Sequence, residues 1–342
     1  MKKYLMGIVS LTFIGLVVYH SGCSQSREIF RAEPNEPETT PVKVISPLSI
    51  CSFNIQFLGN FKKKDNETLS QILKDYDIVV VQELVAPPIE GDYPDGSAYS
   101  ADPEAATFLQ AMQNKGFRYI LSEEDTGTGD TIHLASTATE WWITFYKPSR
   151  VDYAPDLPHG FLAEDRSNND FYERVPYAFS FRTLDNHLDF VLISVHFNPG
   201  DSNSDQERRR EELGAIVQWI DLNDQQEKDF IILGDMNIKD NKELLGSLPE
   251  GYISLNDECY PTNTTPSSPK PYDHVMYRPR YSTEIDTQWD FVVVNLMEAV
   301  KPYWTGIESF PGDPYVHDLF RQYYSDHHPI VFRMNIPLED DD

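Results

Sequence analysis

The chain has 342 residues, of which 40% are hydrophobic and 13% aromatic, and its formal net charge at pH 7 is -27. This composition can build a sizeable core and excludes an intrinsically disordered protein. The excess of carboxylates argues against tight, nonspecific binding of nucleic acid, because affinity for the phosphate backbone comes mainly from Lys and Arg; it leaves room for a local basic groove and favours divalent cations.

The first 22 residues have the pattern of an export signal. Residues 1–3 are positively charged, residues 4–19 are mostly apolar but too few to span a membrane comfortably, and small residues precede Cys23. The segment resembles a bacterial lipoprotein signal, although His20 stands where that pattern normally has an aliphatic residue. We expect an exported protein anchored in the bacterial cell envelope or surface by a lipid on Cys23. Ordinary secretion and an uncleaved anchor are the alternatives.

The remaining ends of the chain are polar. Residues 23–47 are rich in proline and acidic side chains, which is typical of a flexible tether. Residues 337–342 form an acidic tail. Between them there is no internal repeat and no second linker, so we expect one catalytic domain over residues 48–336.

Apolar runs with strand-like composition alternate with helical patterns along this domain. The predicted helices cover 66–74, 105–115 and 205–222, and the predicted strands cover 48–53, 78–82, 141–146, 176–182, 188–195, 230–233, 273–277, 291–295 and 329–334. Many strands with intervening helices predict an α/β (α+β) fold, a four-layer sandwich of two packed mixed β-sheets flanked by helices.

The third predicted helix begins with a dense run of charges between Asp205 and Glu212. Arg208 and Glu212 stand four residues apart, which favours an ion pair on a solvated helix face. A patch that contacts DNA is the alternative.

Two cysteines remain if Cys23 carries a lipid. Cys51 lies in an apolar strand and is expected to be a small core residue, whereas Cys259 lies in a polar loop and is expected to be free. An exported compartment permits a disulfide between them, which is the alternative.

A carboxylate stands at the end of the second predicted strand. Residues 78–81 are four consecutive aliphatics, which predicts a strand buried on both faces, so Glu83 emerges at the rim of a core. A buried carboxylate needs a cation or a proton, and Mg²⁺ prefers oxygen ligands. Asn54, at the end of the first strand, is expected to add a neutral oxygen. A surface Glu paired with Lys is the alternative.

A second polar group follows the strand at 230–233. Gly234 lets the backbone turn tightly and approach a ligand, and Asp235 and Asn237 then project on the same side. This pair can orient a water molecule and hold a phosphoryl oxygen. An ordinary polar turn is the alternative.

Two histidines also follow strand-like or polar runs, His196 and His327. Glu140 and Asp273 are candidate partners that would hold their tautomers and raise their pKa values. Such histidines can neutralise charge that develops on a phosphate, although a structural role is the alternative for each. His328 precedes a proline and is expected to point into the structure.

In chain order these blocks resemble the endonuclease/exonuclease/phosphatase superfamily, most closely its deoxyribonuclease-I-like branch, over roughly residues 48–334. The resemblance rests on Phe-Asn-Ile at 53–55, Gln-Glu at 82–83, Gly-Asp-x-Asn at 234–237 and Ser-Asp-His-x-Pro at 325–329. It implies that Glu83 binds Mg²⁺ with Asn54 beside it and that Asp326 is a metal ligand or supports one. Mn²⁺ and Ca²⁺ are the alternative cations.

The same resemblance implies roles for the other residues. Asp235 and Asn237 would position the attacking water and the phosphate, and the pairs His196–Glu140 and His327–Asp273 would supply acid, base or electrostatic groups. The segment at 173–176 resembles the family's phosphate-contacting segment, which makes Arg174 a phosphate clamp. Asp290 competes with Asp273 as the partner of His327, but residues 270–274 match the family's Tyr-Asp block more closely.

We therefore expect an exported, Mg²⁺-dependent phosphodiesterase, first of all an endonuclease acting on nucleic acid. Arg174, Lys270, Arg278 and Arg280 fall near the motif blocks and are candidates for a basic patch. The net charge and the membrane tether favour the alternative of a phosphatase or phospholipase acting on a sugar phosphate, an inositol phosphate or a sphingolipid. A noncatalytic surface lipoprotein that binds a ligand is a third hypothesis. No protein partner is inferred.

Overall fold

The computed structural model describes residues 46–127, 139–166, 169–289, 291–304 and 315–340. The predicted signal, Cys23, most of the predicted tether and Asp290 lie outside these residues. Among the described residues, no helix has both the length and the apolar character needed to cross a membrane.

The first sheet is built around the first predicted strand. Its strand order is β14-β15-β1-β2-β6-β5. Only β1 and β2 run parallel, and the other neighbours are antiparallel. The strands are β1 (Leu48–Leu58), β2 (Ile78–Leu84), β5 (Arg118–Leu121), β6 (Trp141–Tyr146), β14 (Val292–Val293) and β15 (Ile330–Met334).

The second sheet has the order β12-β13-β11-β10-β9-β7, and β8 also pairs with β9. Here β10 and β11 form the parallel pair. The strands are β7 (Val151–Tyr153), β8 (Gly160–Phe161), β9 (Tyr177–Thr183), β10 (Asp189–His196), β11 (Phe230–Asp235), β12 (Ile253–Ser254) and β13 (Asp273–Tyr277), while β3 (Gly91–Asp92) and β4 (Ala98–Tyr99) form a separate hairpin.

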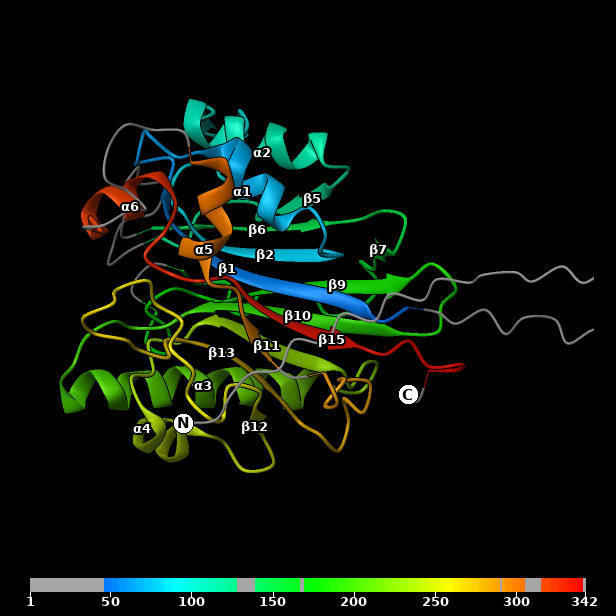
Figure 1. Ribbon diagram of the computed structural model, residues 1–342. Helices are drawn as coiled ribbons and strands as arrows, with labels where there is room; N and C mark the ends of the chain where they lie inside the picture. Colours follow the sequence, from blue (N-terminus) through cyan, green and yellow to red (C-terminus); the bar gives the residue numbers. More distant parts are fainter. Residues whose placement is uncertain (1–45, 128–138, 167–168, 290, 305–314, 341–342) are drawn as a thin grey trace, which may run out of the picture. The chain divides into compact units, whose positions relative to one another are not determined.

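The two sheets face each other and helices cover their outer sides (Figure 1). On the side of the first sheet lie α1 (Asn66–Leu73), α2 (Pro103–Asn114), α5 (Leu296–Val300), the 3₁₀ turn η1 (Lys301–Tyr303) and α6 (His317–Tyr323); on the side of the second lie α3 (Asn203–Asn223) and α4 (Asn241–Ser247). This confirms the predicted fold of two packed mixed sheets flanked by helices.

Side-chain alternation along the strands builds three apolar layers. In β1, Ile50 packs between the sheets, whereas Cys51 and Phe53 pack against the helices. In β6, Trp142 likewise points between the sheets and Trp141 toward the helix side. Because strand residues alternate between faces, each buried strand serves two layers at once.

The structure differs from the predicted elements where segments are short. The predicted strand at 291–295 is reduced to β14, and α5 begins directly afterwards, with the Asn295 side chain accepting a hydrogen bond from the Glu298 N–H. The helices α4, α5 and α6 have only 7, 5 and 7 residues. Two turns or fewer give too little periodicity to separate a helix from a loop.

The charged start of α3 is a solvated face only in part, because two of its charged side chains are buried. The exposed ones are Glu207, Arg210 and Glu211. Arg209 is 1% exposed and Glu212 is 0% exposed. Arg208, the predicted partner of Glu212, donates to the main-chain carbonyls of Asn169 and Asp170. A charge pattern along a helix does not reveal whether loops cover it.

Cys51 and Cys259 are both free, so the alternative of a disulfide between them is excluded. Cys51 is fully buried, and burial raises the pKa of its thiol far above the ordinary value. Such a thiol behaves as a small apolar core residue.

Gly234 allows β10 and β11 to approach at the end of the second sheet. It has φ +140°, and a Cβ atom at this position would lie 2.2 Å from the Val195 carbonyl oxygen. We predict that Gly234→Ala lowers the free energy of unfolding by about 3 kcal/mol or more, because it combines backbone strain with a clash. Denaturant unfolding measures this loss.

Gly214→Ala is the matched control, since Gly214 lies in α3 and a Cβ there meets nothing within 4 Å. We expect this change to be neutral or to stabilise by about 0.5–1 kcal/mol. Equal unfolding curves for Gly234→Ala and the wild type would contradict the close-approach argument.

Candidate active site

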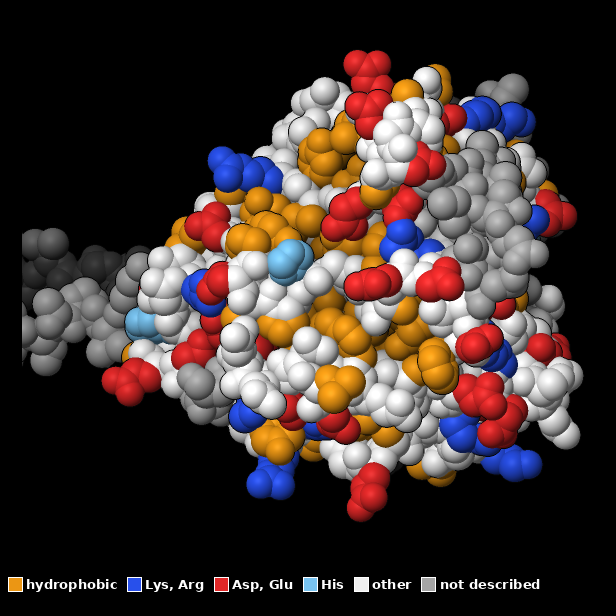
Figure 2. Space-filling view, turned by 180° about the vertical axis from the view of Figure 1, so that it is seen from behind, with side chains coloured by type: hydrophobic (Ala, Val, Ile, Leu, Met, Phe, Trp, Pro, Cys, Tyr) orange, Lys and Arg blue, Asp and Glu red, His pale blue; other side chains and the backbone are white. Residues whose placement is uncertain are grey.

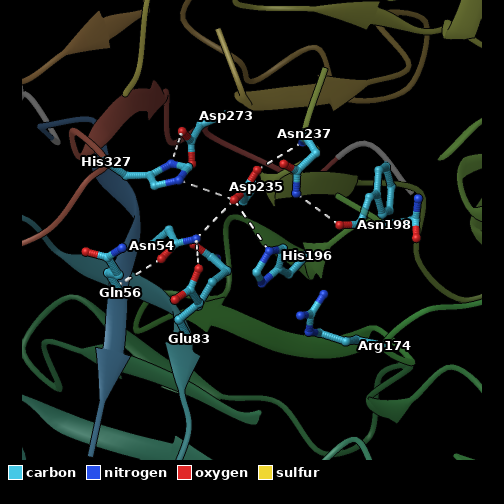
Figure 3. A network of polar contacts seen from close by, with 12 residues as sticks. Asn54, Gln56, Glu83, Arg174, His196, Asn198, Asp235, Asn237, Asp273 and His327 are labelled. Carbon is cyan, nitrogen blue, oxygen red and sulfur yellow. Dashed lines mark hydrogen bonds and ion pairs between the residues drawn. The ribbon is translucent and has the colours of Figure 1, made fainter. Parts of the chain in front are cut away.

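The predicted site residues meet at one edge of the sandwich, where β1, β2, β10 and β11 end and β13 begins (Figure 3). Strand register brings them together: His196 lies opposite Asp235, and Asp235 lies opposite Asp273. The described residues gathered here are Asn54, Glu83, Glu140, Arg174, His196, Asp235, Asn237, Asp273, Asp326 and His327.

Asp235 lies at the centre of this group and is 2% exposed. Its Oδ2 accepts a hydrogen bond from Asn54 Nδ2 at 3.0 Å and lies 3.5 Å from His196 Nε2 and 3.4 Å from His327 Nε2. Its Oδ1 accepts from the Asn237 N–H at 2.9 Å. One carboxylate therefore joins groups from both sheets (Figure 3).

Each histidine is held by a carboxylate on its other nitrogen. His196 Nδ1 lies 2.6 Å from Glu140 Oε1, and His327 Nδ1 lies 2.8 Å from Asp273 Oδ2. Both Nε2 atoms are thereby turned toward Asp235.

The carboxylates also change the protonation of these rings. Burial and Arg174 lower the pKa of His196, but Glu140 and Asp235 outweigh them and the net shift is upward. Burial lowers the pKa of His327 too, yet Asp273 and Asp235 raise it well above 6.5. Both shifts favour the protonated, hydrogen-bond-donating form of the ring over that of a free histidine.

Glu140 links the first histidine to Arg174. Its Oε1 lies 2.7 Å from Arg174 Nε, and its Oε2 accepts from the Glu83 N–H at 3.1 Å. Burial raises the pKa of Glu140, but His196 and Arg174 lower it more, to about 2. Arg174 Nε and Nη1 are both buried without an acceptor in hydrogen-bond geometry among the described residues. The contact with Glu140 is therefore an ion pair, and the guanidinium retains donors for an anionic ligand.

Glu83 reaches the site through an unusual backbone conformation. Val81, two residues earlier, packs on the helix side of the first sheet, and Glu83 would point the same way in a regular strand. Its φ of +60° redirects the side chain toward the second sheet. There Oε1 accepts from Asn54 Nδ2 at 2.8 Å and Oε2 from the Phe57 N–H at 3.0 Å. Strain of this kind persists where the surroundings over-determine it.

Asn54 is oriented differently from our expectation of an oxygen ligand. Its Oδ1 accepts from the Gln56 N–H at 3.0 Å, and its Nδ2 bridges the carboxylates of Glu83 and Asp235. The amide nitrogen occupies a position that a cation would fill between two anions. Asn54 would bind a metal through oxygen only after its amide had turned over.

The donor set nevertheless fits a hard divalent cation. Glu83, His196 and Asp235 each present one potential ligand atom within 4.8 Å of one another, His196 only when its ring is neutral. On the other side of Glu83, Gln56 Nε2 donates to Asp326 Oδ2 at 2.5 Å, while Gln56 Oε1 and Asp326 Oδ1 are buried without a hydrogen-bond donor among the described residues. Oxygen-rich, partly unsatisfied groups of this kind suit Mg²⁺ or Ca²⁺.

Two further residues, Lys64 and the motif residue Ser325, hold the site together, and no role in the site was predicted for either. Lys64 is buried and its Nζ donates to the carbonyls of Ile55, at 2.7 Å, and Tyr324. Burial lowers the pKa of Lys64 to about 7. Ser325 Oγ donates to the Asn54 carbonyl at 2.7 Å and accepts from the His327 N–H at 3.0 Å. Both residues join the end of β1 to the segment that carries Asp326 and His327.

Other expectations have clear outcomes. His328 Nδ1 accepts from the Leu296 N–H at 2.9 Å, and burial lowers its pKa to about 4, so it points into the structure as predicted. Our prediction that Arg278 belongs to a basic patch near the site is wrong. Arg278 follows β13 at the end opposite Asp273 and pairs with Asp221 and Asp224.

Because Asp273 raises the pKa of His327, the contribution of this pair to folding stability should depend on pH. We predict that Asp273→Asn lowers the pKa of His327 and destabilises the metal-free protein by about 3 kcal/mol at low pH, because it breaks a buried charge pair. The stabilisation that the Asp273–His327 pair gives the folded protein is fully present below about pH 6.5, where the histidine is protonated in the unfolded chain. It is lost as pH rises through the pKa of His327 in the folded protein. NMR titration and pH-dependent unfolding measure both effects.

Asp152→Asn, at an exposed position in β7, is the control and should leave the titration of His327 unchanged. A stability difference between Asp273→Asn and the wild type that grows with rising pH would contradict the pairing.

Comparisons with known proteins place the chain in a family. The sequence model of the Endonuclease/Exonuclease/phosphatase family matches residues 51–327. A comparison with curated proteins gave no match.

Many solved structures resemble the fold, including those of two Bacteroides proteins and one from D. rerio. An endonuclease/exonuclease/phosphatase family protein from Bacteroides thetaiotaomicron has 14% sequence identity and a TM-score of 0.55, covering 86% of this chain and 99% of that one. Mannosyl-6-phosphatase from Bacteroides thetaiotaomicron VPI-5482 has 14% identity and a TM-score of 0.53, covering 83% and 98%. TDP2 of D. rerio, complexed with a single-strand DNA product, has 17% identity and a TM-score of 0.50, covering 85% and 100%.

At these identities the solved structures establish the fold alone. The sequence model reaches from β1 to the segment that carries His327, and it spans most of the chain. The chain therefore belongs to the endonuclease/exonuclease/phosphatase family, whose members hydrolyse phosphoester bonds.

Proposed function

We propose that this protein hydrolyses phosphodiester bonds by in-line attack of water, assisted by a divalent cation, and that nucleic acid is its first substrate class. The observation that carries the proposal is the position of Asp235 Oδ2 beside two imidazole Nε2 atoms, at 3.5 and 3.4 Å. A carboxylate between two imidazole donors can take a proton from water while the donors hold the phosphate.

Glu83 and Asp326 are the residues that would hold the cation, with Gln56 and a reoriented Asn54 beside them. When bound, the cation supplies Lewis-acid stabilisation to a phosphoryl oxygen and to the leaving oxygen. The buried Glu83 carboxylate favours cation binding, because burial is the largest cause of its raised pKa and an ionised form needs a compensating charge.

The remaining catalytic and binding roles would fall to side chains of the protein. Because the raised pKa values of both histidines favour the protonated rings, Asp235 is the better base and would orient and deprotonate the attacking water. His327 and His196 would donate from Nε2 to the phosphoryl oxygens, and Asn237 would position the phosphate. Arg174 would clamp the phosphate through its free Nη1.

A specific observation supports the second candidate, a small phosphate ester. On the face shown in Figure 2, Lys and Arg side chains are scattered among acidic ones and make no continuous basic surface. Together with the net charge of -27, this arrangement is unfavourable for a long polyanion. We retain the proposal of an exported protein anchored through Cys23, which would place either substrate class outside the cytoplasm.

Metal dependence gives the first test. We predict that chelation with EDTA abolishes hydrolysis of bis(p-nitrophenyl) phosphate and that Mg²⁺ or Mn²⁺ restores it. Glu83→Gln should weaken cation binding, measured by calorimetry, at least about tenfold, because an amide lacks the negative charge. Glu90→Gln, at an exposed position, is the control. Activity that survives both EDTA and Glu83→Gln would sink the metal proposal.

The substrate panel gives the second test. The protein is incubated with plasmid DNA, RNA and a series of sugar and inositol phosphates, with Asp235→Asn as the inactive control. We expect cleavage of nucleic acid to exceed turnover of monoesters, because the motif blocks resemble most closely the deoxyribonuclease-I-like branch of the family. If only monoesters are hydrolysed, the nuclease proposal is wrong and the second candidate replaces it.

A further inference from the structure

Part of the charged start of α3 is buried against two loops that border the active site. Glu212 is 0% exposed and its two carboxylate oxygens have different main-chain donors. Its Oε1 accepts from the Glu173 N–H at 2.8 Å, and its Oε2 accepts from the Asn198 N–H at 2.9 Å. One side chain therefore joins the segment before Arg174 to the segment after His196.

The second loop leads directly to the centre of the site. Next to Asn198, the Phe197 carbonyl accepts from Asn237 Nδ2 at 3.0 Å, and the Phe197 N–H donates to the Asp235 carbonyl at 2.9 Å. Figure 3 shows Asn198 and Arg174 on the same side of His196. A displacement of the Asn198 main chain is thus coupled to Asn237.

Arg209, one helical turn before Glu212, holds the same loop by donating hydrogen bonds to the main-chain carbonyls of that loop. Its Nη1 donates to the carbonyls of Asn198, at 2.9 Å, and Gly200, at 3.1 Å, and its Nη2 lies 2.6 Å from Glu243 Oε1. The Asn198 main chain is therefore held at both its N–H and its carbonyl by α3. Because this loop is fixed, the carboxylate of Glu212 is fixed as well. Its Oε1 in turn holds the main chain at Glu173.

We propose that Glu212 is a positioning residue that places Arg174 for binding of the substrate phosphate; the proposal rests on the phosphate-clamp role of Arg174. The Arg174 side chain is fixed near its end by Glu140 and near its main chain, through Glu173, by Glu212. The position of the Arg174 main chain decides whether Arg174 Nη1 can reach a phosphate while its Nε remains beside Glu140. A shift of about 1 Å in a positioned group is enough to weaken its contribution strongly.

The chemistry of the contact requires a carboxylate. Burial raises the pKa of Glu212 to about 7, while the main-chain donors at Asn198 and Glu173 oppose that shift. A glutamine of the same shape offers only one acceptor oxygen, and its NH₂ group would face the second N–H. Glu212→Gln therefore keeps the packing and breaks one of the two links.

The test is the steady-state hydrolysis of bis(p-nitrophenyl) phosphate by the full chain with Mg²⁺. We expect Glu212→Gln to raise KM on the order of tenfold and to change kcat by less than about threefold, since ground-state binding of the phosphate is lost. Glu211→Gln, the exposed neighbour on the same helix, should match the wild type. Should Glu212→Gln fail to fold by circular dichroism, Glu212→Asp keeps the charge but is too short to reach both loops.

A double-mutant cycle with Arg174→Ala separates positioning from a general structural role. We expect Arg174→Ala to raise KM, and Glu212→Gln to add nothing further in that background. Independent, multiplicative effects, or an unchanged KM in Glu212→Gln, would overturn the positioning role and leave the clamp intact. An unchanged KM in Arg174→Ala would instead overturn the clamp in the proposed function, and the positioning role with it.

Discussion

The site depends on the burial of several carboxylates in one small volume. Glu83, Glu140, Asp235 and Asp273 are each at most 8% exposed and converge on one edge of the two sheets. Carboxylates that lie this close together repel one another, and burial removes the water that would hydrate each of them. The arrangement is therefore stable only with compensating positive groups. His196, His327 and Arg174 supply part of that compensation, and the amide of Asn54 fills the gap between Glu83 and Asp235.

The same constraint explains why both sheets are needed. A single sheet could carry Asn54 and Glu83, or His196 and Asp235, but not both pairs at hydrogen-bonding distance. A contact between polar side chains ties the sheets together below the site: Gln82 Nε2 donates to Ser194 Oγ at 3.1 Å. Within the first sheet, Ser52 Oγ donates to Gln82 Oε1 at 3.3 Å and holds that amide in place. The apolar layer between the sheets then keeps water from these bonds.

Sequence reasoning worked where a polar residue directly follows a long apolar strand. Asp235 and His196, the last residues of β11 and β10, are examples, since strand ends on a parallel pair share an edge. It failed where burial comes from distant segments. Lys64 stands in a run of three lysines, and nothing local shows that the carbonyls of Ile55 and Tyr324 surround it. The charge pattern of α3 misled for the same reason, because the loops that cover Glu212 come from other parts of the chain.

The first and last strands of the first sheet are neighbours, with Leu48 opposite Met334 and Ser52 opposite Ile330. Closing so long a loop is slow, since its entropy is lost before the pairing compensates for it. His327, which precedes β15, cannot meet Asp235 until this pairing has formed. A chain that lacks β15 therefore lacks half of the imidazole pair around Asp235. The candidate site is complete only after the last strand of the first sheet has paired with the first.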